Sequence, residues 1–292
     1  MNKGLISISE AFSFYFNGIV QRGYREKTVC EYKKDLKQFT DYLASHYPHI
    51  SQINDVKAVH LNDYLDWLIA HRGCTASTRN RRKNTLRSVW KHLLNSGVVT
   101  ENIALELKQV EAEKVEQTFL TEDEINQLLP AINSSDVRRV VLVLYYTGMR
   151  ISECINLRRE HLNFQDRNMR IVNGKGGKQR TIPLSRSLNS YLLKYVSDND
   201  IKEKMFFTRS GGITDRYVNK CLKQATDQLC WDKKVTCHTL RHSFASTLVS
   251  KNINVVTIQK LLGHANLQTT SSYTHVTQQT VEDAVEHINA QF

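Results

Sequence analysis

The sequence predicts a mainly α-helical protein, in which a helical N-terminal domain precedes a mixed α/β domain that is mostly helical with one small β-hairpin. Three observations support this fold class. Apolar residues recur at helical spacing through residues 1–100. A glutamate-rich segment at 101–117 then separates two parts of different character. Beyond it, two short strand patterns flank a glycine-rich turn within an otherwise helical sequence.

Length and composition are those of a globular protein. The chain has 292 residues, 40% hydrophobic and 24% charged, which suggests about two domains with cores that need no disulfide or metal. A disordered chain, a collagen-like chain and a small disulfide scaffold are excluded. The six cysteines form no C-x-x-C pair and are expected to be free thiols. No apolar run of about 18 residues and no signal-peptide pattern occur, so we expect a cytoplasmic protein without a membrane partner.

The charge balance favours a polyanionic partner. The 40 basic and 29 acidic residues give a net charge of +11. Residues 67–100 contain no acidic side chain, and three cations at steps of four flank an apolar stripe, which predicts a helix with a basic ridge. The narrow stripe favours a phosphate backbone over a lipid surface, with a merely solvated face as the alternative. The candidate contacts are Arg79, Arg81, Arg82, Lys83, Arg87 and Lys91.

Four or five helices account for the N-terminal part. Ser9 is expected to cap the first and Thr28 to begin the second. A shorter third spans residues 59–68, and Ser77 or Thr78 caps the basic helix. The many aromatic residues at helical spacing are expected in the core rather than as platforms for stacked bases.

The glutamate-rich segment marks the domain boundary. Five Glu, two Lys and no large aromatic residue in 101–117 indicate an exposed interdomain linker. Thr121 and Glu124 then match a capping box that opens a new unit. We therefore expect a helical domain at 1–106, a linker at 107–117 and a second domain at 118–292.

The second domain mixes helices with one hairpin. A buried helix from Val137 to Tyr146 is followed by Gly148, and Gly174-Lys175-Gly176-Gly177 provides a hairpin turn. The expected strands are 168–172 and 179–183, and the expected later helices are 186–196, 214–230, 239–251, 254–262 and 277–290.

Four short segments of this domain carry chemically active side chains, and two of them precede residue 180. Arg150 and Glu153 lie one helical turn apart, so the carboxylate can hold the guanidinium in place; a surface ion pair is the alternative. Lys175 lies between glycines at the hairpin tip, where it can reach a phosphate and deliver a proton, and Lys178 is the other lysine there. The spacing is not that of a P-loop.

The other two segments lie near the C-terminal end. His238 and Arg241 share a helix face near a helix N-terminus, which suits a phosphate. His264 follows Leu-Leu-Gly, and Tyr273 lies in a polar stretch that argues against simple burial in a core. The segment with His238 and Arg241 does not have the ligand spacing of a zinc site.

Taken in order, these residues resemble the tyrosine recombinases, or phage integrase-type site-specific recombinases, and in particular a Xer-like two-domain member. The resemblance covers residues 118–292 closely and, more loosely, about 7–100 as the helical core-binding domain of that family. The residues that carry it are Arg150 in TGMRISE, Lys175 in GKGGK, His238 and Arg241 in HTLRH, His264 in LLGH and Tyr273 in SSYTH.

The resemblance implies an enzyme that cleaves and rejoins DNA strands through a 3′-phosphotyrosine intermediate, without metal or cofactor. The partners it implies are double-stranded DNA with a specific recombination site and a tetramer on two such sites. The implied roles are nucleophile for Tyr273, phosphate clamp for Arg150 and Arg241, base for His238, acid for Lys175 and hydrogen-bond donor for His264. Arg216, Lys220 and Lys223 are further candidate DNA contacts.

Two other classes compete with this interpretation. A DNA-binding paralogue without cleavage is disfavoured because all six residues are present. A type IB topoisomerase shares the chemistry, but the compact helical N-terminal part disfavours it. The target sequence, the need for an accessory protein and the biological role stay open. That role is expected to be integration or excision of a mobile element, or resolution of a plasmid or chromosome.

Overall fold

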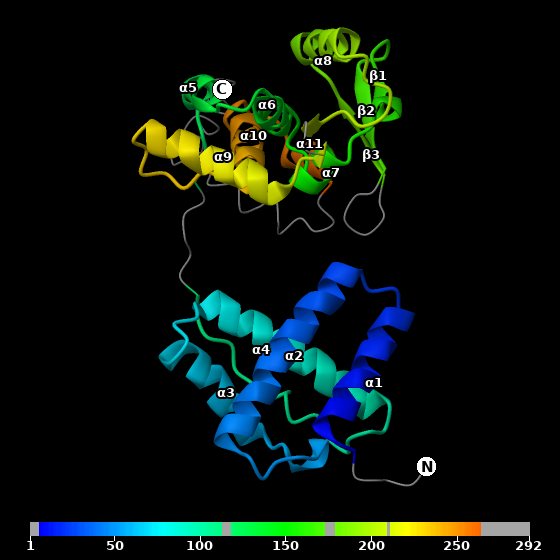
Figure 1. The fold of residues 1–292 in the computed structure, drawn as a ribbon, viewed down its shortest axis with the longest axis vertical. Helices are drawn as coiled ribbons and strands as arrows, with labels where there is room; N and C mark the ends of the chain where they lie inside the picture. The colour runs from blue at the N-terminus through cyan, green and yellow to red at the C-terminus, as the bar shows by residue number, and fades with distance from the viewer. Residues whose placement is uncertain (1–5, 113–117, 173–178, 209–210, 264–292) are drawn as a thin grey trace, which may run out of the picture. The chain divides into compact units, whose positions relative to one another are not determined.

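The computed structural model describes residues 6–112, 118–172, 179–208 and 211–263 (Figure 1). The chain divides into two compact units, Met1–Val115 and Glu116–Phe292. In the described residues the regular elements of the first unit are all helices, and the second unit adds short strands to its helices. The mainly α fold class with a mixed second part is therefore confirmed. Among the helices described, none has the length and apolar character that crossing a membrane requires.

The first unit is a bundle of four helices. They are α1 (Ile8–Gln21), α2 (Glu26–His46), α3 (Ala58–Ala70) and α4 (Ala76–Asn95), with the 3-10 turn η1 (Ile53–Asp55) before α3. Ser7, not Ser9, caps α1, because its hydroxyl accepts from the backbone N–H of Glu10 at 3.3 Å. Thr75 caps α4 in the same way, so both starts lie two or three residues earlier than predicted. An N-cap side chain accepts from the backbone N–H two or three residues further on, and these two hydroxyls accept from the third.

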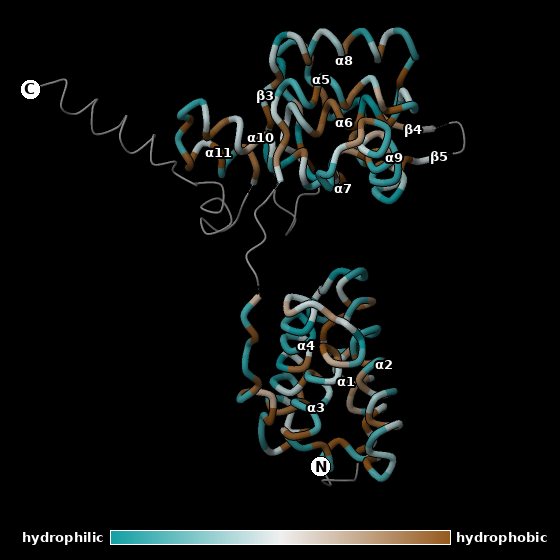
Figure 2. Tube along the Cα trace, turned by 90° about the vertical axis from the view of Figure 1, so that its left-hand side faces the viewer, coloured by the Kyte–Doolittle hydropathy of each residue, from teal (hydrophilic) through white to brown (hydrophobic). Residues whose placement is uncertain are grey.

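Aromatic rings form the core of this unit, as the sequence predicts. Trp90, Tyr15, Phe39 and Tyr64 come one from each helix and are at most 1% exposed. The Phe39 ring centroid lies 5.1 Å from that of Tyr64 and 6.2 Å from that of Trp90. Figure 2 shows hydrophobic residues along each of these helices. Such burial supplies most of the stability of a small helical domain.

Residues 104–110, here called the connector, follow α4 and pack against it. Ala104 and Leu107 are fully buried in the first core. The guanidinium of Arg87 donates to three connector carbonyls, those of Ala104 at 3.1 Å, Leu105 at 2.8 Å and Leu107 at 2.7 Å. The prediction of an exposed linker is wrong for Ala104 and Leu107, whose apolar side chains join the first core, whereas the other side chains of the connector are exposed or partly exposed.

A second set of contacts fixes the far end of the connector. Asn80 donates to the carbonyl of Val110 at 2.7 Å and accepts from its N–H at 3.0 Å. Arg79 donates to the carbonyl of Lys108 at 3.0 Å. Polar side chains on one face of α4 thus supply the hydrogen bonds that this irregular backbone would otherwise form within a strand or helix.

We expect Arg87→Ala to lower the free energy of unfolding of the first unit by about 2 kcal/mol, because three connector carbonyls lose their donor. Urea unfolding of the full chain measures this change. Lys91→Ala, at an exposed position of the same helix, is the control and should stay within about 0.5 kcal/mol of the wild type. Equal losses in the two variants would contradict the structural role of Arg87.

The second unit contains the expected helices and hairpin arms, together with shorter elements that the sequence did not indicate. Its helices are α5 (Glu122–Ala131), α6 (Ser135–Thr147), α7 (Ile151–Ile155), α8 (Arg186–Asp198), α9 (Asp215–Gln228), α10 (Cys237–Ser250) and α11 (Val255–Leu262), with the 3-10 turn η2 (Arg159–His161). Thr121 and Glu124 form the predicted capping box of α5. The helix expected at 277–290 lies outside the described residues.

A three-stranded antiparallel sheet flanks the helices. Its order is β1 (Leu162–Asn163), β2 (Asn168–Ile171) and β3 (Arg180–Pro183), and Ile171 pairs with Arg180. The strands β2 and β3 are the predicted hairpin arms, whereas the two-residue strand β1 and the pair β4 (Phe207–Thr208) and β5 (Gly211–Gly212) are too short to leave a periodic signal.

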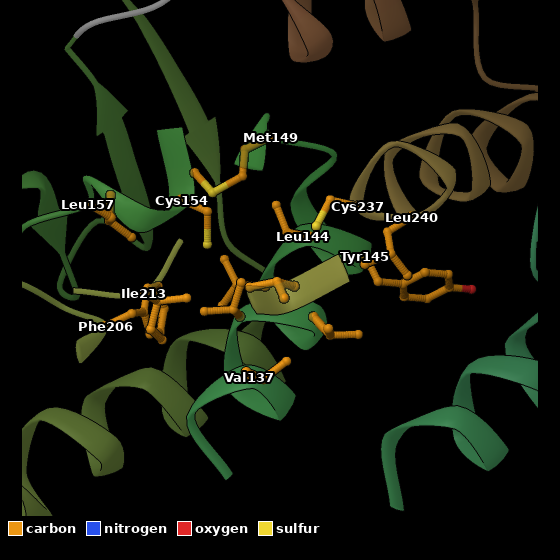
Figure 3. Packing of buried hydrophobic residues seen from close by; sticks show 14 of the residues in the cluster. Val137, Leu144, Tyr145, Met149, Cys154, Leu157, Phe206, Ile213, Cys237 and Leu240 are labelled. Atoms are coloured by element: carbon orange, nitrogen blue, oxygen red, sulfur yellow. The ribbon is translucent and has the colours of Figure 1, made fainter. Parts of the chain in front are cut away.

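The second core is built around α6. Val137 and Leu144 of this helix are fully buried, and Figure 3 shows them among side chains from α7 and α10. Met149 and Cys154, on either side of Arg150 and Glu153, belong to the same cluster and are 0% exposed. This core therefore fixes the backbone on which the candidate site is built.

Candidate active site

A tight turn after α6 positions Arg150. Gly148 ends the helix with φ of +61°, and a Cβ there would lie 2.3 Å from the ring of Phe244 on α10 and 2.9 Å from Leu262 on α11. Only glycine fits both the left-handed conformation and this close approach. The turn therefore brings the start of α7, where Arg150 is the N-cap residue, against α10 and α11.

The carboxylate of Glu153 is the centre of a buried ion cluster. Its side chain is 2% exposed and accepts from the N–H of Arg150 at 2.8 Å and from the guanidinium of Arg150 at 2.9 Å. Arg180 donates to both carboxylate oxygens, at 2.9 and 2.7 Å. The predicted pairing of Arg150 with Glu153 is present, and it is part of a larger buried cluster rather than a surface pair.

These contacts lower the pKa of Glu153. Burial alone would raise it, but the hydrogen bonds and positive charges of Arg180 and Arg150 outweigh burial and bring the pKa down from 4.5 to about 2. The cluster is therefore ionised at neutral pH, with one carboxylate between two guanidinium groups.

Arg241 joins the Gly148 turn to the end of α11. The residue is 2% exposed, and its guanidinium donates to the carbonyl of Gly148 at 2.6 Å and to that of Leu262 at 2.7 Å. These bonds hold a permanent positive charge beside the turn that carries Arg150.

His238 lies one turn before Arg241 and is solvent-exposed. Partial desolvation, followed by the positive charges of Arg241 and Arg150, lowers its pKa below the ordinary 6.5. Its ring meets that of His242 edge-on at 4.3 Å between centroids, and burial lowers the pKa of His242 to about 4. At neutral pH His238 is therefore a neutral imidazole beside two cations, able to accept a proton.

Of the six residues predicted to act on a phosphate, the structure brings together Arg150, His238 and Arg241. Lys175, His264 and Tyr273 lie outside the described residues. Sequence reasoning missed Arg180, which gives no motif by itself. The one local signal for Arg180 is its position directly after the predicted hairpin turn. No acidic residue in the sequence stands out as its partner.

The candidate DNA contacts on α4 are partly engaged within the first unit. Arg79 pairs with Asp66, Arg81 and Arg82 pair with Asp35, and Arg87 holds the connector. Lys83 is 3% exposed, so the predicted exposed ridge is wrong at Lys83, whereas Arg87 is partly buried and Lys91 is exposed. On α9, Arg216, Lys220 and Lys223 are all exposed, and Lys223 pairs with Asp227 at 2.8 Å.

Comparison with known proteins decides the family. The model of the phage integrase family matches residues 118–280, and that of the phage integrase N-terminal SAM-like domain matches residues 13–97. A tyrosine recombinase of Thermosipho africanus is 33% identical over 288 residues, which covers 96% of this chain and 99% of the relative. The tyrosine recombinase XerC of Anoxybacillus flavithermus is 31% identical, with 88% and 90% covered. The chain belongs to the phage integrase family of tyrosine recombinases.

Solved structures share the fold. A lambda integrase dimer bound to a COC′ core site matches with a TM-score of 0.77 at 19% identity, over 93% of this chain and 78% of that one. The Tn1549 transposon integrase in complex with a circular intermediate DNA matches with a TM-score of 0.76 at 17% identity, over 97% and 100%. A lambda integrase tetramer bound to a Holliday junction gives 0.75 at 20% identity, over 92% and 78%. The resemblance inferred from the motifs is thus confirmed, and this tyrosine recombinase carries out site-specific DNA recombination.

We expect Glu153→Gln to lower the free energy of unfolding of the second unit by about 3 kcal/mol at pH 7, because a pKa lowered from 4.5 to about 2 stabilises the fold. This contribution is complete above pH 4.5 and is lost as the pH falls toward 2. Urea unfolding at pH 7, 5 and 3 should therefore show the difference from wild type narrowing only at pH 3. Glu203→Gln, at an exposed position of the same unit, is the control, and a pH-independent difference for Glu153→Gln would contradict the assignment.

Proposed function

We propose that this recombinase cleaves DNA by attack of Tyr273 on a phosphodiester, held by Arg150 and Arg241 and assisted by His238. The observation that carries the proposal is the convergence of these three residues on the Gly148 turn. Two permanent cations there flank a neutral imidazole. Fixed cations stabilise the charge that grows on the non-bridging oxygens in the transition state.

The reaction is a balanced transesterification. The Tyr273 oxygen forms a bond to phosphorus as the bond from phosphorus to the 5′ oxygen breaks, which leaves a 3′-phosphotyrosine and a free 5′-hydroxyl. The tyrosine proton passes to His238, and Lys175 protonates the leaving 5′ oxygen. His264 donates a hydrogen bond to the phosphate. Attack by a 5′-hydroxyl on the phosphotyrosine reverses these steps and rejoins the strands, with no metal or cofactor in the scheme.

The proposed substrate is double-stranded DNA with a specific site, bound by a helical domain at 1–106 and a catalytic domain at 118–292. In the first, Lys91 and the outer edge of Arg81 are the exposed candidates on α4. In the second, α9 presents Arg216, Lys220 and Lys223. Assembly as a tetramer on two sites is supported by the shared fold with the lambda integrase tetramer bound to a Holliday junction. We place this activity in the cytoplasm, on a mobile element, plasmid or chromosome.

Covalent trapping tests the nucleophile. Wild-type protein with nicked DNA from the region flanking the gene, in the presence of a chelator, should form a protease-sensitive adduct at one discrete site. Tyr273→Phe should bind the same DNA and form no adduct. Equal adducts from both proteins would move the nucleophile elsewhere, and specific binding without an adduct would favour a non-cleaving paralogue. Relaxation of any supercoiled plasmid without a specific site would favour a topoisomerase.

The pH dependence of cleavage tests the base. Because desolvation and the positive charges of Arg241 and Arg150 lower the pKa of His238, its neutral form persists below pH 6.5. The single-turnover cleavage rate should therefore stay constant from pH 8 to 6.5 and fall only at lower pH. His238→Asn should cleave at least ~100-fold more slowly and lose this acid limb. An unchanged limb in the variant would assign it to another group.

A further inference from the structure

We infer that Arg180 is a positioning residue for strand cleavage, which acts by holding Glu153 so that Arg150 is left for the phosphate. The inference rests on the proposed cleavage at Tyr273 and assigns a function to an arginine outside the six motif residues. Arg180 is the first residue of β3, across from Ile171 of β2, and its side chain is 11% exposed.

All three kinds of N–H in the Arg180 guanidinium have partners. Its two Nη groups donate to the two oxygens of Glu153, and its Nε donates to the carbonyl of Leu261 at 3.0 Å. A guanidinium matches a carboxylate in this two-pronged manner, which a lysine cannot copy. One side chain thus joins the hairpin arm β3 to the start of α7 and to the end of α11.

The charges in the cluster explain what Arg180 contributes. Glu153 carries one negative charge and is 2% exposed, whereas Arg150 is the more exposed of its two cations, with 25% of its side chain accessible against 11% for Arg180. The two Nη groups of Arg180 donate to both carboxylate oxygens of Glu153, whereas the Arg150 guanidinium donates to only one of them. Without Arg180, the buried carboxylate would be left with Arg150 alone, and the second prong of that guanidinium would turn inward to neutralise it. The charge available to a substrate phosphate would then fall.

Arg180 also packs against the point where α11 ends. Gly263 caps that helix with φ of +66°, and a Cβ there would lie 2.9 Å from Cδ of Arg180. The carbonyl of Gly263 accepts from Arg150 at 3.4 Å. His264 is the next residue in the chain, so Arg180 fixes the backbone immediately before a second residue of the proposed reaction.

A salt bridge with a purely structural role predicts a different result. It would change the stability of the fold and leave the cleavage rate of folded, DNA-bound protein unchanged. A positioning role predicts normal DNA binding with slow cleavage. The size of the cleavage defect should also depend on the negative charge of the phosphate that Arg150 faces.

The experiment measures single-turnover cleavage of a nicked substrate at saturating DNA by the full-length chain. Arg180→Gln should bind DNA within about twofold of wild type but cleave at least ~100-fold more slowly, and Arg180→Lys should lie between the two. Arg170→Gln, at an exposed position of the neighbouring strand β2, is the matched control and should cleave at the wild-type rate.

A neutral substrate separates the two roles. Replacing one non-bridging oxygen of the scissile phosphate by methyl removes its negative charge, so a cation facing it matters less. On this methylphosphonate the defects of Arg150→Ala and Arg180→Gln should shrink together. The double variant should cleave the normal substrate no more slowly than Arg150→Ala alone, because both changes remove one function.

Each outcome has a distinct meaning. Wild-type cleavage by Arg180→Gln, or a defect that the neutral substrate does not reduce, would overturn the role of Arg180 while leaving Tyr273 chemistry intact. Absence of any adduct with wild-type protein on its bound site would instead overturn the proposed function. If Arg180→Gln is unfolded at the assay temperature, Arg180→Lys, which keeps the charge without the fork, decides by the same two measurements.

Discussion

The buried carboxylate of Glu153 is the constraint on which the candidate site depends. Removing an ionised carboxylate from water costs several kcal/mol unless close cations and hydrogen bonds compensate. Here the compensation comes from Arg150 and Arg180, which lie on separate elements. One buried charge thus ties the start of α7 to β3, and Arg150 is the more accessible of its two cations.

The same device occurs in the first unit. Asp35 of α2 is 5% exposed, and it pairs with Arg81 and Arg82 of α4 and accepts from the hydroxyl of Thr85 at 2.9 Å. A sequence rich in basic residues therefore does not translate directly into a basic surface. On α4 a large part of the charge that suggested a phosphate-binding ridge ties helices and connector together, and burial lowers the pKa of Lys83.

Sequence patterns predicted contacts between residues close together in the chain and missed contacts between residues far apart in it. The capping box at Thr121, the hairpin arms and the pairing of Arg150 with Glu153 depend on residues within one turn or one loop, and local patterns indicated them. Arg180 meets Glu153 across 27 positions and Leu261 across 81. No periodicity encodes such contacts. The connector escaped prediction for the same reason, since Arg87 reaches it over 17 to 20 positions.

The segment Thr147 to Glu153 shows why a motif is more than its reactive group. The hydroxyl of Thr147 donates to the carbonyl of Val143 at 2.6 Å, Gly148 makes the left-handed turn, and Met149 is fully buried beside it. Each of these residues fixes the conformation of the backbone and has no part in the proposed reaction itself. A guanidinium displaced by about 1 Å loses much of its effect on a transition state. The residues proposed to touch the phosphate therefore depend on neighbours that hold them, and we infer that Arg180 is such a neighbour although it stands outside the six motif residues.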